Sequence, residues 1–355
     1  MNNTRACASP SSIKALIVDD APIMRKAIEK IVGRSDQIEV VGMAANGQEC
    51  LTKIEELQPD VITLDIDMPV MNGITAVKNI MVRHQKPVVI ISSLVRDGYF
   101  AFEALRLGVV DFIPKPSRVS GDDWESEENL VRMRVLLASG MQVKRMRRVR
   151  RRKLSQAHFN SNRSSPTAAV LLGTNLAGPN AIMHIITSLP RDFAGAVIAV
   201  QEIHPQILGP FCSYFNAISP LEVHPVADGC RLLAGRVYVG STFTGINVVA
   251  APGGGYVLRV SESPVSPIDT LFETAAYHFK ENSCGVLMTG VGSDGAEGLR
   301  TIRMRGGLTM GQKQECCAYP NLVQHALDED VLDKVLPRRG IVSQLQDWVR
   351  ERRVS

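Results

Sequence analysis

The sequence of 355 residues lacks the long apolar run that a membrane-spanning helix requires, because no stretch approaches about 20 consecutive apolar residues. Residues 1–12 are polar, carry Arg5 as their one charged side chain, and lack the apolar core of a secretory signal peptide. Aromatic residues make up only 5% of the chain, which argues against a broad aromatic platform for bases or sugars. We therefore expect a globular protein of the cytoplasm.

The sequence also lacks cysteine pairs spaced to bind a metal, and its basic residues do not indicate a generally basic surface. The seven cysteines include no Cys-x-x-Cys pair, and the adjacent Cys316 and Cys317 are poorly spaced to chelate one metal, so we expect ordinary reduced thiols. The net charge of +4 depends on eight basic residues between Lys144 and Lys153, without which the net charge becomes −4. The positive charge therefore belongs to one short run.

Two regions alternate short apolar runs with amphipathic segments, which is typical of parallel sheets covered by helices. The first region predicts strands at Ile13–Val18, Glu39–Ala44, Val61–Leu64, Val88–Ser92 and Val109–Ile113. The second predicts strands at Ala168–Leu172, Ala196–Val200, Leu221–His224, Val237–Gly240, Val286–Met288 and Leu308–Met310. We expect an α/β protein of two domains, at residues 12–117 and 168–350.

The segment between the domains, residues 118–167, differs in composition. It begins with an acidic patch and continues into Leu130–Lys153, which contains no Pro and only Gly140, so that a helix is expected there. Leu154–Thr167 is rich in Ser, Asn and Gln, which indicates a flexible hinge. We predict a linker helix followed by this hinge.

Acidic residues follow two predicted strands of the first domain. Asp19 and Asp20 end the first strand and Asp65 ends the third, so their carboxylates should meet at one edge of a parallel sheet. Three carboxylates in one cleft repel each other unless a hard cation such as Mg²⁺ neutralises them. Ser92 and Lys115 follow the fourth and fifth strands and place a hydroxyl and an ammonium group at the same edge, suited to phosphoryl oxygens.

This region resembles response-regulator receiver domains, which have a flavodoxin-like fold. The matching residues are Val18-Asp19-Asp20, Asp65-Ile66-Asp67-Met68-Pro69 with Asn72-Gly73, Ser92 and Lys115-Pro116. The resemblance implies that Asp65 is phosphorylated, and that Asp20, Asp65 and the backbone carbonyl of Asp67 hold Mg²⁺ with help from Asp19. It also implies that Ser92 and Lys115 contact the phosphoryl group and that Phe112 occupies the aromatic switch position.

The second domain is similar to the chemotaxis protein-glutamate methylesterase family, in which a receiver precedes a doubly wound, mostly parallel α/β esterase domain. The matching segments are Gly173-Thr174-Asn175-Leu176-Ala177-Gly178-Pro179, Gln201-Glu202-Ile203-His204-Pro205 and Thr289-Gly290-Val291-Gly292-Ser293-Asp294-Gly295. In the family these segments supply a Ser–His–Asp triad. Here Asn175 and Glu202 stand at the serine and histidine positions, and only Asp294 is retained.

The departures fall on residues that would face the cleft, while the turn glycines and the apolar runs match. An amide is a very poor nucleophile, and the carboxylate of Glu202 has no adjacent hydroxyl to activate. A rebuilt site of Thr174, His204 and Asp294 is an alternative, although a shift by one residue on a tight elbow points the side chain elsewhere. Asp294 also has a simpler interpretation as a residue that caps its glycine-rich loop.

Three functions remain open on the sequence. The leading hypothesis is a chemotaxis-type response regulator, phosphorylated by a histidine kinase, that binds methyl-accepting chemoreceptors with weak or absent catalysis. In the family, phosphorylation relieves a block of the esterase cleft by the receiver. The first alternative is an active protein-glutamate methylesterase that also deamidates glutamine. The second is a nucleic-acid-binding regulator that uses Lys144–Lys153, but this run carries no interleaved aromatics and no DNA-binding fold follows it.

Overall fold

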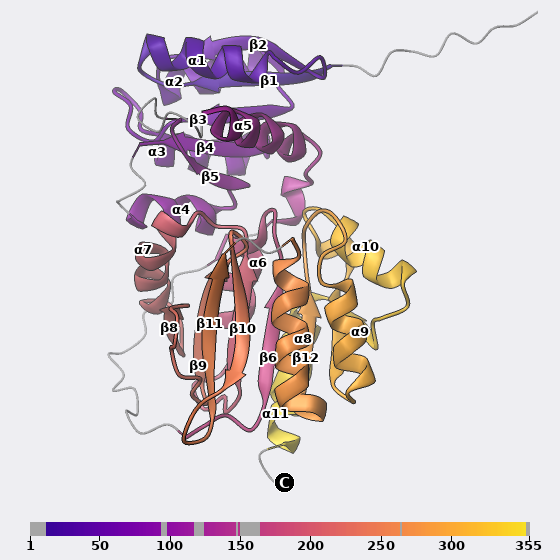
Figure 1. Ribbon diagram of the computed structural model, residues 1–355. Helices are drawn as coiled ribbons and strands as arrows, with labels where there is room; N and C mark the ends of the chain where they lie inside the picture. The colour runs from indigo at the N-terminus through magenta and orange to yellow at the C-terminus, as the bar shows by residue number, and fades with distance from the viewer. Residues whose placement is uncertain are drawn as a thin grey trace, which may run out of the picture. The chain divides into compact units, whose positions relative to one another are not determined.

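The chain forms two compact units in a computed structural model that describes residues 12–93, 98–116, 124–146, 148–149, 164–262 and 265–352 (Figure 1). One unit contains the chain up to Ser93 together with Ile113–Met141, and the other contains Leu94–Phe112 and Gln142–Ser355. Among the described residues, no helix has both the length and the apolar character to cross a membrane.

The first unit is built on a five-stranded sheet. The strands follow the order β2-β1-β3-β4-β5, and β2, β1, β3 and β4 pair in parallel. Their bounds are Ile13–Val18 (β1), Ile38–Ala44 (β2), Val61–Leu64 (β3), Val88–Ser92 (β4) and Asp111–Pro114 (β5). The helices of this unit are α1 (Pro22–Val32), α2 (Gly47–Leu57), α3 (Gly73–Asn79) with the π-helical turn η1 (Ile80–His84), and α5 (Trp124–Ser139).

The fifth strand begins later than the sequence predicted. We expected Val109–Ile113, but the backbone N–H of Val109 donates to Ala104 O and that of Gly108 donates to Leu105 O, at the end of helix α4 (Gly98–Leu107). Residues 108–109 therefore close the helix, and β5 starts only at Asp111.

The helix expected at Leu130–Lys153 is shorter and starts earlier. Helix α5 covers Trp124–Ser139, and its buried Val131, Val135 and Ala138 recur at helical spacing, so the helix packs against α1 within the first unit. It ends just before Gly140, where glycine favours termination. A single 3-10 turn, η3 (Val143–Arg145), follows in place of further α-helix.

Of the basic run Lys144–Lys153, residues 147 and 150–153 lie outside the described part of the chain. Lys144 and Arg148 are exposed, whereas Val149 is buried. The N–H of Val149 donates to Arg106 O at 3.1 Å, and Nη1 of Arg106 donates to Val149 O at 2.8 Å. Within the second unit, these two bonds fasten the chain to the end of α4.

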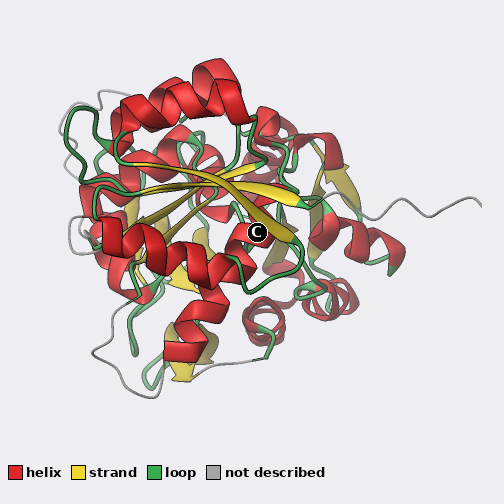
Figure 2. Ribbon diagram, turned by 90° about the horizontal axis from the view of Figure 1, so that it is seen from above, coloured by secondary structure: helices red, strands yellow, loops and turns green. Residues whose placement is uncertain are grey.

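The second unit is built on a seven-stranded sheet in the order β14-β13-β12-β6-β7-β9-β8, with every pair parallel. The strands are β6 (Ala169–Gly173), β7 (Ala196–Gln201), β8 (Glu222–Pro225), β9 (Arg236–Ser241), β12 (Ser283–Leu287), β13 (Leu308–Gln312) and β14 (Lys334–Leu336). Its helices, besides α4, are α6 (Gly178–Ile186), α7 (Pro205–Asn216), α8 (Pro267–Phe279), α9 (Ala296–Met304), α10 (Asn321–Asp328) and α11 (Arg338–Glu351). Helices lie on both faces of this sheet (Figure 2), and both units therefore have the parallel α/β architecture that the sequence predicted.

An antiparallel hairpin, β10 (Thr244–Ala250) and β11 (Tyr256–Glu262), was not assigned from the sequence. Ile246, Val248 and Leu258 bury one face of the hairpin and belong to the same hydrophobic cluster as Leu271 and Phe272 of α8. The hairpin thus extends the hydrophobic core on the α8 face of the sheet.

Candidate functional site

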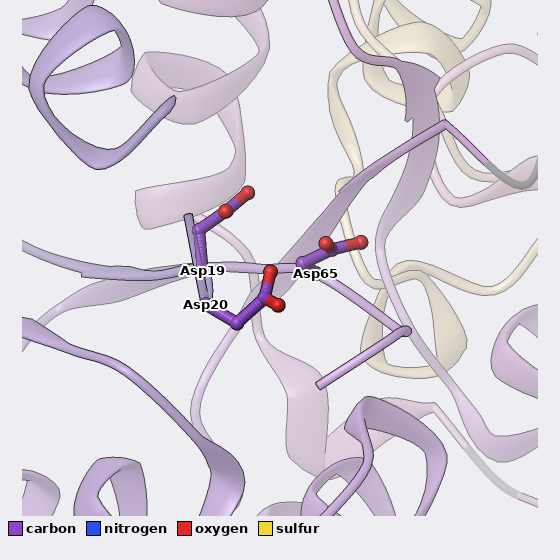
Figure 3. Close-up of side chains that lie close together, drawn as sticks. All are labelled: Asp19, Asp20 and Asp65. Atoms are coloured by element: carbon purple, nitrogen blue, oxygen red, sulfur yellow. The ribbon is translucent and has the colours of Figure 1, made fainter. Parts of the chain in front are cut away.

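The carboxylates predicted from the sequence do gather at one edge of the first sheet. Asp19 and Asp20 directly follow β1, and Asp65 directly follows the neighbouring strand β3. One carboxylate oxygen of each lies within 4.8 Å of the others (Figure 3). Asp19 and Asp65 are buried, whereas Asp20 is exposed. The cluster is therefore open to solvent on the Asp20 side.

Lys115 neutralises part of this negative charge. Its Nζ lies 2.6 Å from Oδ2 of Asp65 and 2.7 Å from Oδ2 of Asp19. Burial raises the pKa of Asp19, and the ion pair with Lys115 opposes that rise without cancelling it. Burial alone would lower the pKa of Lys115, but its ion pairs with the negatively charged Asp19 and Asp65 raise it. Lys115 therefore stays charged at the centre of the cluster.

The cluster fits Mg²⁺ by its donor chemistry. The side-chain atoms that it offers as metal ligands are all carboxylate oxygens, which this cation prefers. In the described part of the chain, Oδ2 of the buried Asp19 accepts no hydrogen bond of good geometry and is balanced by the Lys115 ammonium group. Such an oxygen retains lone pairs for a cation. Asp67, whose backbone carbonyl is the expected further ligand, is exposed in the loop after β3.

Two other residues expected at this edge are also buried. Ser92 is the last residue of β4, and its carbonyl oxygen accepts from the backbone N–H of Lys115 at 3.1 Å. This bond fixes the backbone from which the Lys115 side chain projects. Phe112 lies within β5, where its N–H donates to Oδ1 of Asp111.

The second candidate site lies at the carboxyl ends of β6 and β12 in the seven-stranded sheet. From β6 the chain proceeds to β7 on one side, and it later returns to place β12 on the other. Such a reversal of strand order is where open α/β sheets usually bind ligands. The loops that leave β6 and β12 carry Asn175 and Asp294.

Asn175 joins these two loops through its side-chain amide. Its Nδ2 donates to Val291 O at 2.8 Å, and its Oδ1 accepts from Val291 N at 2.8 Å and from Leu176 N at 2.7 Å. Gly290 makes this approach possible, because a Cβ at that position would lie 2.2 Å from Oδ1 of Asn175. We call this pairing of the Asn175 amide with the Val291 peptide group the amide bridge.

In the alternative set of Thr174, His204 and Asp294, each side chain is hydrogen-bonded to backbone groups. The Thr174 hydroxyl is buried and donates to the carbonyl oxygen of Thr289. His204 is the N-cap of α7, where its Nδ1 accepts from the N–H of Gln206 at 3.3 Å. The Thr174 hydroxyl and the His204 imidazole are therefore both hydrogen-bonded to backbone groups. Glu202 is half-buried, directly after β7.

Asp294 caps the start of helix α8, whereas the simpler interpretation of this residue placed its role in its own glycine-rich loop. Its Oδ2 accepts from Ile268 N at 3.0 Å and its Oδ1 from Asp269 N at 2.9 Å, at the start of α8. Asp269 in turn accepts from Gly295 N and Gly298 N at the start of α9. Burial raises the pKa of Asp294 to about 6. The two backbone N–H donors lower this pKa in part, and the nearby Asp269 carboxylate raises it further.

The capping role of Asp269 was missed on the sequence, although a signal for it exists. The segment Ser266-Pro267-Ile268-Asp269 places proline and then an acid in the first turn of a helix, which is a typical helix start. The close approach of Gly290 to Asn175 has no comparable signal, because it depends on two loops that are far apart in the sequence.

Comparison with known proteins identifies a domain around each of these two regions. A family model described as CheB methylesterase matches residues 170–345, and one described as response regulator receiver domain matches residues 15–120. Protein-glutamate methylesterase/protein-glutamine glutaminase 2 of Carboxydothermus hydrogenoformans is 33% identical over 96% of this chain and 100% of its own length. The Geobacillus kaustophilus protein-glutamate methylesterase/protein-glutamine glutaminase is 33% identical over 96% of this chain and 99% of its own.

A crystal structure of the CheB methylesterase catalytic domain of Thermotoga maritima is 24% identical, with a TM-score of 0.48, and covers 51% of this chain and 97% of that one. The two family models and the near-complete coverage of the relatives agree on the assignment. The chain belongs to the CheB methylesterase family and carries a response regulator receiver domain ahead of the methylesterase domain.

Proposed function

We propose that this protein is a response regulator that is phosphorylated on Asp65 and whose methylesterase-like cleft has weak or no hydrolytic activity. The amide bridge carries the second half of the proposal, because Asn175 stands at the nucleophile position with both ends of its amide bonded to Val291. The nucleophile position therefore holds neither a hydroxyl that could attack an ester nor a basic group that could take up a proton. The proposal treats residues 12–117 as the receiver, 118–167 as the linker and 168–350 as the esterase-like domain.

The chemistry at Asp65 needs an in-line approach and charge neutralisation. A carboxylate oxygen of Asp65 attacks the phosphorus of a phosphohistidine, the P–N bond breaks, and the imidazole leaves with a proton from solvent. Lys115 already lies 2.6 Å from Asp65 and would bind an oxygen of the incoming phosphoryl group, as would Ser92. Asp20, Asp65 and the backbone carbonyl of Asp67, with help from Asp19, would hold Mg²⁺, which would neutralise phosphoryl charge when bound.

The partners in this proposal are a chemotaxis-type histidine kinase as phosphodonor and methyl-accepting chemoreceptors as binding targets. Both follow from the receiver and methylesterase domains that the chain shares with its relatives. A non-hydrolytic copy would bind receptors or take up phosphoryl groups without demethylating its target.

Phosphoramidate with MgCl₂ tests the receiver half directly. We expect the purified chain to gain one acid-labile phosphoryl group, seen as a mass increase, and Asp65→Asn to gain none. Equal labelling of Asp65→Asn and the wild type would contradict the assignment of Asp65.

A second candidate function is active demethylation and deamidation. It is favoured by relatives that are named protein-glutamate methylesterase/protein-glutamine glutaminase and match almost the whole chain. It would need a nucleophile other than Asn175, because an amide is a very poor nucleophile. Thr174 does not supply one, because its buried hydroxyl is bonded to a carbonyl oxygen.

A further inference from the structure

The three carboxylates at the edge of the first sheet are not held equally. Oδ1 of Asp19 accepts from a backbone N–H at 2.9 Å, and its Oδ2 lies 2.7 Å from Nζ of Lys115. Asp65 is held in the same way, by a backbone N–H at 2.7 Å and by Nζ of Lys115 at 2.6 Å. In the described part of the chain, the carboxylate of Asp20 is exposed and has no hydrogen bond or ion pair. The position of this carboxylate therefore depends on the backbone that carries it.

Arg25 fastens that backbone. Its half-buried side chain projects from α1, and its Nη1 donates to the carbonyl oxygen of Asp19 at 2.5 Å and to that of Asp20 at 2.9 Å. The two hydrogens of one nitrogen thus bond two consecutive peptide groups. Hydrogen bonds from a charged donor are stronger than those between neutral groups. The guanidinium group therefore restrains the turn between β1 and α1, from which the Asp20 side chain projects.

Helix α1 begins without a side-chain cap. Its N-cap residue is Ala21, which has no side-chain acceptor, and the proline at the next position has no N–H to donate. Among the described residues, two side chains bond to the backbone of this turn. Asp19 accepts from the N–H of Ala21, and Arg25 donates to the two carbonyl oxygens. Of these two, only Arg25 bonds to Asp20.

The charge of Arg25 acts against a positioning role. A guanidinium group near a cation site repels the cation, so on charge alone its removal would strengthen Mg²⁺ binding. Loss of its two hydrogen bonds would have the opposite effect, because a freed Asp20 would adopt conformations that do not face Asp65, and ordering it again would cost entropy. The two effects differ in sign, and an experiment can therefore separate them.

On the basis of the proposed phosphorylation of Asp65, we propose that Arg25 is a positioning residue for the Mg²⁺ that this step requires. Its bonds to the carbonyl oxygens of Asp19 and Asp20 hold the Asp20 carboxylate where it can share a cation with Asp65. Groups that orient metal ligands without touching the metal typically contribute about 10- to 100-fold in metal affinity. We expect a contribution of about tenfold here.

Isothermal titration calorimetry of the full chain with MgCl₂, without a phosphodonor, measures this contribution. Arg25→Met removes the charge and both donors but keeps the aliphatic bulk, whereas Arg25→Lys keeps the charge on a side chain that is one bond shorter. The control is Lys26→Met. Lys26 is exposed at the next position of α1, and no hydrogen bond among the described residues joins it to the turn. The control therefore removes a positive charge and leaves the two bonds in place.

We expect Arg25→Met to bind Mg²⁺ about tenfold more weakly than the wild type, Arg25→Lys to lie between them, and Lys26→Met to stay within about twofold of the wild type. Phosphorylation by phosphoramidate should show the same separation. In Arg25→Met the Mg²⁺ concentration for half-maximal rate should rise about tenfold, while the rate at saturating Mg²⁺ stays within about threefold. A variant with a merely damaged fold would lose the saturated rate as well.

Mg²⁺ binding by Arg25→Met that equals or exceeds that of the wild type would overturn the proposal, and so would a loss confined to the saturated rate or a wild type that binds no Mg²⁺. If Arg25→Met does not fold, Arg25→Lys decides the matter, because wild-type affinity in that variant would show that the charge suffices. A wild type that binds Mg²⁺ but is not phosphorylated by phosphoramidate would instead contradict the proposed function, and the calorimetric comparison would still test Arg25.

Discussion

The amide bridge of Asn175 makes a quantitative prediction about stability. Replacing Asn175 with Ser removes the donor to Val291 O and the acceptor for Val291 N, each 2.8 Å away, because the serine side chain is too short to reach both. A hydrogen bond contributes about 1 kcal/mol net, so we expect the second unit to lose about 2 kcal/mol of unfolding free energy. For a unit of this size that loss lowers the midpoint of thermal unfolding by about 4–8 °C.

The assay can be confined to the second unit. Trp348 lies buried in α11, and Trp124 is the one other tryptophan of the sequence, so a Trp124→Phe background leaves Trp348 as the fluorescent reporter. The matched control is Asn247→Ser on β10, whose amide makes a 3.4 Å bond to Ser261 Oγ. We expect that control to lie within about 0.5 kcal/mol of its parent. If Asn175→Ser were as stable as its parent, or more stable, the bridge would have no structural role and the reasoning would be wrong.

Three further predictions follow from the same contacts. The pKa of Asp294 in the folded state is about 6, above its ordinary 3.8, so the folded state binds the proton more tightly than the unfolded state. The unfolding free energy should therefore fall by about 3 kcal/mol as pH rises from about 4 to above 6. Urea titrations at several pH values should show a weaker pH dependence of this free energy in Asp294→Asn, and an unchanged dependence would refute the shift. Gly290→Ala should cost about 2 kcal/mol in urea unfolding by displacing the Asn175 amide, and should cost less in an Asn175→Ser background; strict additivity would argue against the contact. Lys115→Met removes the cation nearest to Asp65, so MgCl₂ should raise its unfolding midpoint more than that of the wild type in differential scanning fluorimetry, and an equal rise would contradict this account.

The sequence predicted the strands of both sheets to within a few residues, except β14, since buried parallel strands are nearly continuous apolar runs. The edge strand β14 was missed because it has only three residues, Lys334–Leu336, and begins with an exposed lysine. It also predicted that Asp19, Asp20 and Asp65 would meet, because parallel topology places successive strand ends at one edge. The hairpin β10–β11 was missed, since its strands carry polar and glycine residues and are buried on one face only.

The contacts between loops could not be read from the sequence. That Asn175 was a poor nucleophile followed from its chemistry, but its bonds to Val291 depend on the approach of two loops that lie 116 residues apart. The end of α5 at Ser139 was also missed. The basic residues that follow have a good helix propensity, and propensity alone does not reveal where the packing of α5 within the first unit stops. The burial of Val149 against Arg106 has the same origin in tertiary packing.

Release of methanol from methylated chemoreceptors tests the central claim most directly. Purified full-length protein would be assayed with and without phosphoramidate and MgCl₂, beside a double variant, Asn175→Ser with Glu202→His. We predict little or no release by the native protein under either condition and much faster release by the double variant, whose serine and histidine stand at the family's positions. Methanol release by the native protein that rises with phosphorylation would contradict the account and make this chain an active methylesterase with a different nucleophile.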